Sequence, residues 1–385
     1  MAAKVAVGIS DEIDAVEAFS TAARAARADL PEPCDLCVVF AGAPHLGHAK
    51  WLLSAVHEEL APAHLIGCGA GGVVGPGREL EEGPGAVVWA ASLPGARIET
   101  RHFRIDQDGA EPELIGLGDG ELGETLIVLA DPYTFPTELL LRELDSAAPG
   151  VPVLGGLASA AAAGSAALFR DGDVLHEGAV GCSLAGVEVL SCVSQGAAPV
   201  GPEMTITAAE GNVIAELASA PAIERLREAI ATLTPSEQAL AASGLMLGLV
   251  IDENQPDYER GDFLVRPVIG ADPEAGTIAI GERVRVGQTV RMHVRDGASA
   301  DEDLRAALGL QSAALGGRGA AGALLFTCNG RGAHMFDVPD HDATALDDAL
   351  DAPVGGFFCA GEIGPVGGRN FLHGFTATIA VFPRD

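Results

Sequence analysis

Residues 321–332 read AGALLFTCNGRG, and residues 354–365 read VGGFFCAGEIGP. Each stretch is a short apolar run that stops at glycines and charged residues. Ala323–Thr327 and Gly355–Cys359 are long enough for buried strands, and the glycines that follow let the backbone approach a ligand or another loop closely. Because open α/β sheets bind their ligands where strands end, the two stretches together predict a binding site.

The segment between these two strands has the pattern of a helix. Leu346 and Leu350 stand at i,i+4 spacing, and Asp342 precedes them as a suitable N-cap. The order strand, helix, strand and glycine turn occurs at three other places, which are residues 34–72, residues 125–156 and, in a degenerate form, residues 245–272. No single residue is common to all four copies, so we predict internal α/β repeats at the level of architecture only.

Other segments have the pattern of antiparallel strands. Ala86–Ala91 is expected to pair with Arg97–Phe103, and residues 167–193 are expected to form a run of paired strands. Residues 210–230 predict a helix that is broken near Pro221. We therefore predict an α/β (mixed α+β) fold, a layered sandwich of mixed sheets flanked by helices. Its two related domains are expected to be residues 1–218 and residues 219–385.

Composition narrows the classes of function. The chain has 385 residues, with 23 Lys+Arg against 54 Asp+Glu and a formal net charge of −31. Nucleic acids and anionic membranes are unfavourable partners for such a surface. The N-terminus lacks the pattern of a secretory signal, and no apolar run approaches the roughly 18 residues of a membrane span. We predict a cytoplasmic protein that binds neither nucleic acid nor membrane.

Familiar nucleotide and metal motifs are weak. Gly67-x-Gly69-x-x-Gly72 fits a dinucleotide pattern, but Val73-Val74-Gly75-Pro76 follows and cannot begin the helix that holds a pyrophosphate. The seven cysteines lie mostly in apolar runs and do not resemble a disulfide framework. Cys34 and Cys37 have CxxC-like spacing without a second pair of ligands nearby. We therefore predict a structural glycine turn, no cofactor and no metal.

The arginines beside predicted strands can be interpreted in two ways, as ligand-binding residues or as members of internal ion pairs. Arg266 lies in an apolar strand, Arg295-Asp296 ends another, and Arg331 stands between two glycines. A guanidinium at such a place can hold a carboxylate or phosphate by two hydrogen bonds. The alternative is an internal ion pair that only fastens loops, for instance Arg295 or Arg331 with Asp296 or Glu362. Both interpretations can hold for different arginines.

A cysteine nucleophile is a further alternative. Such an enzyme needs a thiolate paired with a histidine. The candidates are Cys328 and Cys359, with His334, His341 or His373 as the base. Both cysteines follow or lie in apolar strands, where a buried thiol is usually inert.

Several motifs, taken in order, resemble the FIST family, named for F-box and intracellular signal transduction proteins. The motifs are Gly196–Gly201, Thr205–Asn212, Phe263–Arg266, Gly270–Pro273, Arg295-Asp296, Cys328–Gly332, Gly361–Pro365 and Asn370–Thr376. Ile66–Gly71 is similar to the glycine turn of the family's N-terminal domain, with Gly69 and Ala70 in place of the usual polar residues. The resemblance spans nearly the whole chain. It implies a sensory, small-ligand-binding module, with amino acids suggested as ligands, that accompanies signalling domains in bacteria and an F-box in eukaryotes.

We recognise no kinase, cyclase or F-box in this chain, so we expect a stand-alone pair of FIST domains whose output passes through a downstream signalling protein. The leading hypothesis is a non-enzymatic sensor that binds an amino-acid-like ligand in a pocket of the C-terminal domain. The arginines would hold the ligand carboxylate, and Glu362 suits an ammonium group. The predicted ligand-binding residues are Arg266, Arg295, Asp296, Cys328, Asn329, Arg331, Glu362, Asn370 and His373. The alternatives are a cysteine-dependent acyl-transfer or hydrolytic enzyme and a protein-interaction scaffold.

Overall fold

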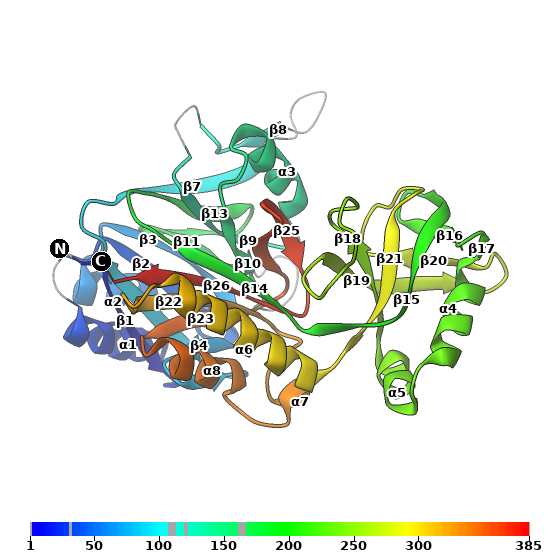
Figure 1. Cartoon of the computed structure of the whole chain (residues 1–385). Helices are drawn as coiled ribbons and strands as arrows, with labels where there is room; N and C mark the ends of the chain where they lie inside the picture. Colours follow the sequence, from blue (N-terminus) through cyan, green and yellow to red (C-terminus); the bar gives the residue numbers. More distant parts are fainter. Residues whose placement is uncertain (1, 31–32, 107–112, 119–121, 161–166, 385) are drawn as a thin grey trace. The chain divides into compact units, whose positions relative to one another are not determined.

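The structure, a computed structural model, describes residues 2–30, 33–106, 113–118, 122–160 and 167–384. The chain divides into two compact units (Figure 1). Unit 1 comprises Met1–Val193, Leu304–Leu372 and Thr376–Asp385, and unit 2 comprises Ser194–Asp303 and His373–Phe375. Unit 2 is thus inserted in the sequence of unit 1. The boundary predicted at 218/219 falls within unit 2.

Unit 1 is built from three similar arrangements of strands and helices, here named repeats 1 to 3. Repeat 1 consists of β1 (Lys4–Ser10), α1 (Ala15–Asp29), β2 (Leu36–Gly42), the 3-10 helix η1 (Ala43–His48), α2 (Ala49–Leu60), β3 (His64–Ala70), β4 (Val73–Gly75), β5 (Arg78–Leu80) and β6 (Ala86–Ser92). Repeat 2 consists of β7 (Arg97–Asp106), β8 (Glu113–Ile115), β9 (Thr125–Ala130), α3 (Thr137–Ala147), β10 (Val153–Leu157), β11 (Leu168–Arg170), β12 (Asp173–Leu175) and β13 (Ala179–Ala185).

Repeat 3 is interrupted by unit 2 after its first strand. It consists of β14 (Leu190–Gln195), α6 (Gly297–Ala314), β22 (Ala320–Cys328), α7 (Ala333–Phe336), α8 (His341–Leu350), β23 (Val354–Cys359), β24 (Glu362–Val366), β25 (Arg369–His373) and β26 (Thr376–Pro383). The unit boundaries fall inside β14 and α6. The insertion therefore enters between the first strand and the first helix of the repeat.

Each repeat has a parallel pair of strands at the centre of one sheet. The pairs are β2 with β3, β9 with β10, and β22 with β23. Parallel neighbours need a crossover connection, usually a helix, and α2, α3 and α8 supply it in the three repeats. On one side of each pair lies an antiparallel strand from the end of the same repeat, namely β6, β13 or β26. The predicted strand–helix–strand copies at 34–72, 125–156 and 323–361 are confirmed.

The other side of each parallel pair is covered by strands that belong to a different repeat. β4–β5 of repeat 1 joins β23 of repeat 3, β24–β25 of repeat 3 joins β10 of repeat 2, and β11–β12 of repeat 2 joins β3 of repeat 1. The three repeats thus exchange strand pairs in a closed cycle. Because each sheet needs a strand pair from another repeat, the repeats are not independent folding units.

One glycine recurs at the same place in all three repeats. Gly67, Gly155 and Gly356 lie in the second parallel strand, opposite Val39, Val128 and Leu325 of the first. A Cβ at these glycines would lie 2.3, 1.8 and 1.9 Å from the opposing carbonyl oxygen. The expectation that no residue is shared is therefore wrong for these three copies, because close approach of the two backbones requires glycine here.

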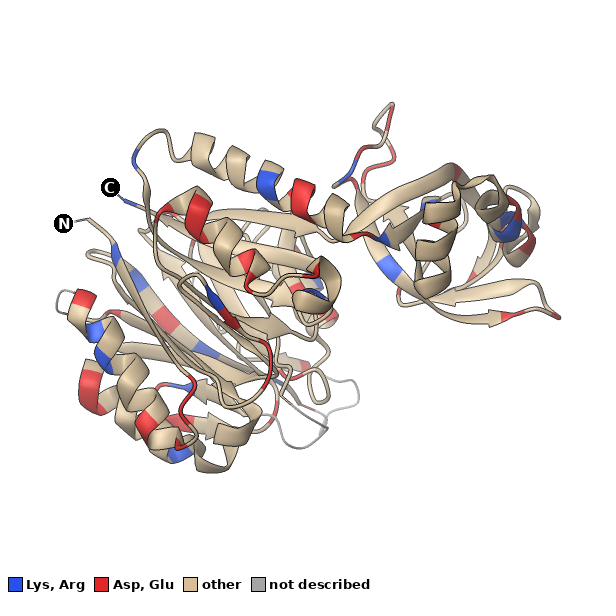
Figure 2. Ribbon diagram, turned by 90° about the horizontal axis from the view of Figure 1, so that it is seen from below, with Lys and Arg blue, Asp and Glu red and all other residues tan. Residues whose placement is uncertain are grey.

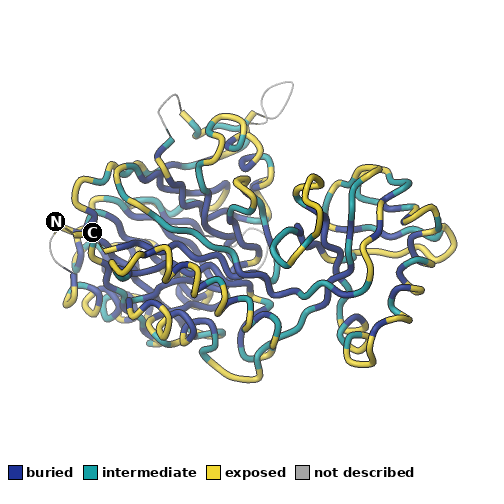
Figure 3. The backbone as a smooth tube through the Cα atoms, in the orientation of Figure 1, coloured by how far each residue is buried: buried dark blue, intermediate teal, exposed yellow. Residues whose placement is uncertain are grey.

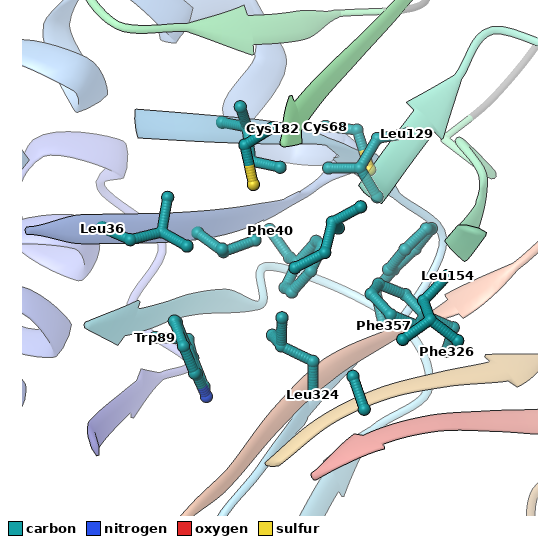
Figure 4. Packing of buried hydrophobic residues seen from close by; sticks show 14 of the residues in the cluster. Leu36, Phe40, Cys68, Trp89, Leu129, Leu154, Cys182, Leu324, Phe326 and Phe357 are labelled. Carbon is teal, nitrogen blue, oxygen red and sulfur yellow. The ribbon is translucent and has the colours of Figure 1, made fainter. Parts of the chain in front are cut away.

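The central core of unit 1 lies where the three sheets face one another. It contains side chains from all three repeats, among them Phe40, Trp89, Leu129, Leu154 and Phe357 (Figure 4). The Phe40 and Phe357 rings stack with centroids 4.7 Å apart. The Trp89 Nε1 donates a hydrogen bond of 3.1 Å to the Ala323 carbonyl. Apolar burial inside and helices outside confirm the predicted mixed sheets flanked by helices.

Helices cover the outer faces, and three further clusters fill the space beneath them. In α1, Asp14 caps the N-terminus by accepting from the Val16 and Glu17 amides, each at 3.0 Å. Its buried side includes Ala18, Phe19 and Ala22. Figure 3 shows the strands as mostly buried and the helices as alternating between buried and exposed residues. This is the pattern of amphipathic helices on a sheet.

Unit 2 contains an antiparallel sheet that closes on itself. Its elements are β15 (Ala197–Glu210), β16 (Val213–Leu217), β17 (Ala220–Pro221), α4 (Ala222–Thr232), α5 (Pro235–Ser243), β18 (Leu245–Val250), β19 (Phe263–Asp272), β20 (Thr277–Ile280) and β21 (Thr289–Arg295). The strand order β15-β21-β18-β19-β20-β16-β17 is closed by an additional pairing of β15 with β16. Irregular register in β15 and β19 fits strands that bend around a small barrel.

Several local predictions are wrong. Residues 245–272 form the antiparallel pair β18–β19 rather than a fourth strand–helix–strand copy. Residues 210–221 contain β16 and β17, and the helix begins only at Ala222. β6 and β7 belong to different sheets, so the expected pair does not form. In residues 167–193 only β11 pairs with β12, because β13 and β14 are placed in two other sheets.

Candidate functional site

The candidate site lies where the two parallel strands of repeat 3 end. Cys328 and Cys359 are the last residues of β22 and β23 and lie opposite each other in register. The Asn329 amide donates to the Cys359 carbonyl at 2.9 Å, which ties the two turns together. Gly332 has a φ of +100°. That conformation favours glycine and allows the chain to turn directly after Arg331.

Arg331 is completely buried and paired with Asp342 of α8. Its Nε donates to Asp342 Oδ2 at 2.7 Å, and its Nη2 donates to Asp342 Oδ1 at 2.8 Å. Asp342 Oδ2 also accepts from the Thr327 hydroxyl at 2.7 Å. Burial would raise the pKa of Asp342, but the Arg331 guanidinium outweighs it and holds that pKa well below its usual range. The bidentate face of Arg331 is therefore already occupied.

Glu362, the first residue of β24, is the second completely buried ionisable group of the site. Its Oε2 accepts from the Thr376 amide at 3.1 Å and from the Thr376 hydroxyl at 2.9 Å. Burial raises its pKa to about 8, while Thr376, Cys328 and Arg331 lower it in part. At neutral pH most of this carboxyl therefore carries a proton.

Arg331 and Glu362 each keep one buried polar atom without a hydrogen bond. Arg331 Nη1 and Glu362 Oε1 find no hydrogen-bond partner among the residues that the structure describes. The two side chains lie close enough that each shifts the pKa of the other. An unsatisfied buried polar group costs about 1–3 kcal/mol, and more when it is charged. A native protein that keeps two of them side by side calls for a polar partner such as water or a ligand.

Segment 332–343 follows Arg331, places Phe336 over the Arg331 guanidinium and is held by acidic residues of repeat 1. Glu81 Oε1 accepts from the Ala333 amide at 2.8 Å, and Glu79 Oε1 accepts from the Ala343 amide at 2.9 Å. Burial, and then the charge of Asp342, raises the pKa of Glu79 to about 7. Glu79 belongs to the exchanged pair β4–β5. The strand exchange thus brings carboxylates of repeat 1 into hydrogen bonds with the segment that follows Arg331 in repeat 3.

The nine predicted site residues are divided between the two units. Cys328, Asn329, Arg331, Glu362 and Asn370 lie in unit 1, and Arg266, Arg295, Asp296 and His373 lie in unit 2. Within unit 1 the structure brings together Cys328, Arg331 and Glu362, since both neighbours influence the pKa of the glutamate. The ligand-binding role of all nine stays a prediction.

In unit 2 three of these side chains have partners of their own. Arg266 Nη2 pairs with Glu282 Oε2 at 3.0 Å. The Arg295 guanidinium lies 4.7 Å from the centroid of the Phe375 ring. Asp296 Oδ2 accepts from the Ser299 amide at 3.2 Å in the first turn of α6. Internal ion pairing is therefore present at Arg266 and Arg331, with Glu282 and Asp342 as the partners instead of the carboxylates named from the sequence.

The two predicted asparagines differ in how their side chains are used. Asn370 is buried, and its Oδ1 accepts from the Val153 amide at 2.8 Å. Its Nδ2 donates to Asp145 Oδ1 at 2.8 Å and to the Val151 carbonyl at 2.9 Å. Asn329 is exposed. Asn370 thus holds β25 to the start of β10, whereas Asn329 leaves its side chain on the surface.

The cysteine and histidine candidates for a nucleophilic pair have different surroundings. His373 groups with unit 2, and Cys328 lies close enough to Glu362, Arg331 and Cys359 to influence the pKa of each. Burial, together with Glu362, raises the pKa of the Cys359 thiol well above its usual value. His341 Nδ1 lies 2.9 Å from Asp342 Oδ1, and its ring stacks on Phe336. The surroundings of Cys359 therefore disfavour a thiolate at that residue.

Sequence reasoning missed three residues of the site. Asp342 was expected to cap α8, but the helix begins at His341 after Asp340, whose φ is +59°. Asp342 instead lies in the first turn and faces Arg331. Thr376 lies in the Asn370–Thr376 motif that resembles the FIST family. The structure adds its role, which is to donate two hydrogen bonds to Glu362. No sequence signal indicates Glu79, because it is 264 positions from the amide that it binds.

One groove of unit 1 lies away from the candidate site. A groove of about 760 Å³ lies beside β1 and is lined by residues that include Val5, Asp29, Asp347 and Arg384. None of the nine predicted residues lines it. In the described part of the chain no cluster of His, Cys, Asp and Glu could hold a metal ion. Across the same residues, each helix is too short or too polar to cross a membrane.

Comparison with known proteins gives the same family over both halves of the chain. The FIST N domain matches residues 35–219, and the FIST C domain matches residues 222–365. The uncharacterized protein Rv0628c of Mycobacterium tuberculosis (strain ATCC 25618 / H37Rv) is 45% identical over 383 residues, covering 98% of this chain and 99% of the relative. The uncharacterized protein Mb0898c of Mycobacterium bovis is 43% identical over 386 residues, covering 99% of each chain. FIST domains are associated with signal transduction and sensing. The chain belongs to the FIST family.

Proposed function

We propose that the protein is a cytoplasmic sensor that binds a small amino-acid-like metabolite between Arg331 and Glu362. The observation that carries the proposal is the pair of buried, unpartnered atoms Arg331 Nη1 and Glu362 Oε1. A zwitterion has a carboxylate that can accept from Nη1 and an ammonium group that can donate to Oε1. One ligand of this class would satisfy both atoms.

The geometry narrows what the ligand can be. Asp342 occupies the bidentate face of Arg331, so the ligand carboxylate receives donors from Nη1 alone. Arg331 and Glu362 are both 0% exposed, so a ligand reaches them only when part of the surrounding chain moves, and a small ligand is favoured over a large one. Phe336 of segment 332–343 packs over the Arg331 guanidinium, with 5.0 Å between the guanidinium carbon and the ring centroid. Movement of this segment would break the hydrogen bonds that Glu81 and Glu79 accept from the Ala333 and Ala343 amides.

The protonation of Glu362 predicts how affinity depends on pH. Its pKa of about 8 leaves it mostly neutral at pH 7. Binding an ammonium group needs the ionised form, so one proton is released on binding. Affinity should therefore rise up to tenfold per pH unit below about pH 8 and level off above it. A ligand that offers only a carboxylate would show the opposite trend, because protonated Glu362 could donate to it.

We propose a non-enzymatic role, with the output passed to a separate signalling protein. Burial and the Glu362 carboxyl disfavour a thiolate at Cys359. The net charge of −31 favours neither nucleic acid nor an anionic membrane as the receiver of the signal.

Thermal unfolding against the twenty amino acids tests the proposal. An amino acid at 100 times its Kd should stabilise the protein by about 2.7 kcal/mol. Glu362→Gln keeps the shape of the side chain but cannot hold an ammonium group as a charge pair, so the stabilisation should vanish. Glu58→Gln on the exposed face of α2 is the matched control and should retain it. Equal stabilisation of the Glu362→Gln variant, or no stabilisation of the wild type by any amino acid, would contradict the proposal.

A further inference from the structure

Strand β1 forms one end of its sheet and leaves its outer edge without a neighbouring strand. The sheet order is β1-β6-β2-β3-β11-β12, so β1 pairs with β6 on one side only. An edge strand presents a row of N–H and C=O groups that can pair with a strand of another chain. With seven residues, β1 is the longest edge strand among the described strands of the three sheets of unit 1.

The other edges of these sheets are short or are capped by side chains. β5, β8 and β12 have three residues each. At β14, Gln311 Nε2 donates to the Ser191 carbonyl at 2.8 Å, and at β25, Asp145 Oδ1 accepts from the Asn370 amide at 3.3 Å. Over the described ranges of the chain, no loop or side chain forms a hydrogen bond to the backbone of β1. Because proteins usually protect their exposed edges, an open edge of this length calls for a partner.

The groove of about 760 Å³ runs along this edge. Six consecutive residues, 2–7, line it, which places the edge of β1 on the groove rather than one of its two faces. Repeat 3 contributes apolar lining with Ala321, Ala352 and Pro353. A strand added to a sheet lies about 4.8 Å from its neighbour. The groove therefore offers space beside β1 for an extended segment.

Carboxylates outnumber cations around the groove. Asp29, Asp347 and Asp351 line it, against Lys4 and Arg384. All five side chains are exposed, and none of them forms an ion pair with another described side chain. The whole chain carries a net charge of −31. Long-range electrostatics therefore favours a basic segment in the groove and repels an acidic one.

We propose that the edge of β1 binds an extended segment of a partner protein that carries lysine or arginine side chains. The backbone of the segment pairs with β1 and supplies affinity, while its basic side chains reach the aspartates and supply selectivity. A second copy of this chain fits the groove less well, because it brings the same excess of negative charge. The Glu362 site takes no part in this interaction, so its failure would leave the proposed function untouched.

Three synthetic peptides with blocked ends separate strand pairing from attraction between charges. The probe is TVKVTVKVT. The peptide TVEVTVEVT reverses its charge, and TPKPTPKPT keeps its charge but replaces each valine by proline, which β-sheets tolerate poorly. Fluorescence anisotropy with the full-length protein measures the Kd of each peptide. We expect TVKVTVKVT to bind at least about tenfold more tightly than either of the other two.

Variants and hydrogen exchange place the bound peptide on the protein. Asp347→Asn combined with Asp351→Asn should weaken the binding of TVKVTVKVT about fivefold, because two exposed charge pairs are lost. Asparagine is tolerated at position 351, where φ is +46°. Asp348→Asn is the matched control, since Asp348 is exposed on the same helix but does not line the groove. Bound TVKVTVKVT should slow amide exchange in residues 4–10 and leave the edge strand at residues 190–195 unchanged.

Several results would overturn the proposal. Equal binding of TPKPTPKPT and TVKVTVKVT would mean that charge alone attracts the peptides. Equal binding by the wild type and the Asp347→Asn, Asp351→Asn variant, or unchanged exchange in β1, would place the peptide elsewhere. Absence of binding at millimolar TVKVTVKVT would also contradict it. A dimer of the free protein in which the β1 amides are already protected would assign the edge to a second copy instead.

Discussion

Repeats 1 and 3 close the same arrangement of strands with very different residues at the strand ends. After β2 and β3, repeat 1 continues with Ala43 and Gly71-Gly72, whereas repeat 3 carries Arg331 after β22 and Glu362 after β23. Repeat 2 is intermediate. Its Asp131 accepts from the nearby Tyr133 amide and Thr134 hydroxyl, and its Ser159 accepts from the Gly71 amide at 2.8 Å.

The comparison separates what the fold needs from what the site adds. Repeat 1 shows that the turns after the parallel strands can close without buried ions. Burying an ion pair often stabilises a fold no more than well-packed apolar residues do. The buried charges of repeat 3 are therefore not a requirement of the shared topology, and a function is the better explanation for their presence. Figure 2 shows Asp and Glu spread over helices, strands and loops of the chain.

The largest expected effect comes from breaking the ion pair of repeat 3. Arg331→Met leaves Asp342 buried without its partner and should lower the free energy of unfolding by about 3–5 kcal/mol. The double variant Arg331→Met with Asp342→Leu should recover most of this loss, since the topology does not need the charges. Chemical denaturation at pH 7 measures the free energy of unfolding of the single and the double variant. Arg24→Met, at an exposed position of α1, is the control. A double variant as unstable as the single one would show that the fold itself depends on the pair.

The second effect is the pH dependence of stability that Glu362 imposes. Its pKa is raised from 4.5 to about 8 in the folded protein, so the folded state holds a proton that the unfolded state loses. The stabilisation is complete below pH 4.5 and falls by about 1.4 kcal/mol per pH unit up to about pH 8. Glu362→Gln should remove this slope. Glu79, with a pKa of about 7, adds a slope of the same sign that remains in the variant.

Unfolding titrations at half-unit pH steps, on wild type and Glu362→Gln, isolate the contribution of Glu362 as the difference between the two curves. A difference that stays flat between pH 5 and pH 8 would mean that the carboxyl is ionised in the folded state, and the proton-release argument for ligand binding would fail with it.

The third effect concerns the glycine that the repeats share. Gly67→Ala, Gly155→Ala and Gly356→Ala each force a Cβ against a backbone carbonyl and should cost about 1–3 kcal/mol. Gly155 should cost most, because its φ of +148° also disfavours alanine. Gly47→Ala is the control, since a Cβ there meets nothing within 4 Å. If one of the three variants has the same free energy of unfolding as the control, the two parallel strands of that repeat do not approach as closely as in the other repeats.

The smallest effect separates the two asparagines. Asn370→Ala removes the partners of Val153 and Asp145 and should cost about 1–3 kcal/mol. Asn329→Ala alters an exposed side chain and should change stability by less than about 0.5 kcal/mol. Chemical denaturation of the two variants tests this difference. If the m-values are equal, the shift of each denaturation midpoint reports the change in stability. A large loss in Asn329→Ala would reveal a structural role for its side chain.

Local patterns in the sequence predicted the elements but not their pairing. The strands β22 and β23 and the buried Leu346 and Leu350 followed from apolar runs and helical spacing. The exchange of strand pairs could not be predicted, because short strands such as β4 and β11 carry no signal for a partner far away in the sequence. Their partners are fixed by how the three sheets share one core.

Only part of the candidate site could be predicted, because local patterns again gave no information on partners far away in the sequence. Arg331 and Glu362 were identified because glycines and buried runs surround them. The partner of Arg331 was not, since Asp342 stands where a local rule assigns an N-cap. Glu79 contributes through a contact across 264 positions. Residues that act through local geometry were therefore visible in the sequence, and those brought in by tertiary packing were not.

The most direct measurement is a high-resolution crystal structure of the protein soaked with the amino acid that gives the largest thermal shift. The account predicts electron density for that amino acid, with its carboxylate within about 3 Å of Arg331 Nη1 and its ammonium nitrogen within about 3 Å of Glu362 Oε1. Density for the amino acid at another place, or Nη1 and Oε1 bonded directly to each other with nothing between them, would contradict it.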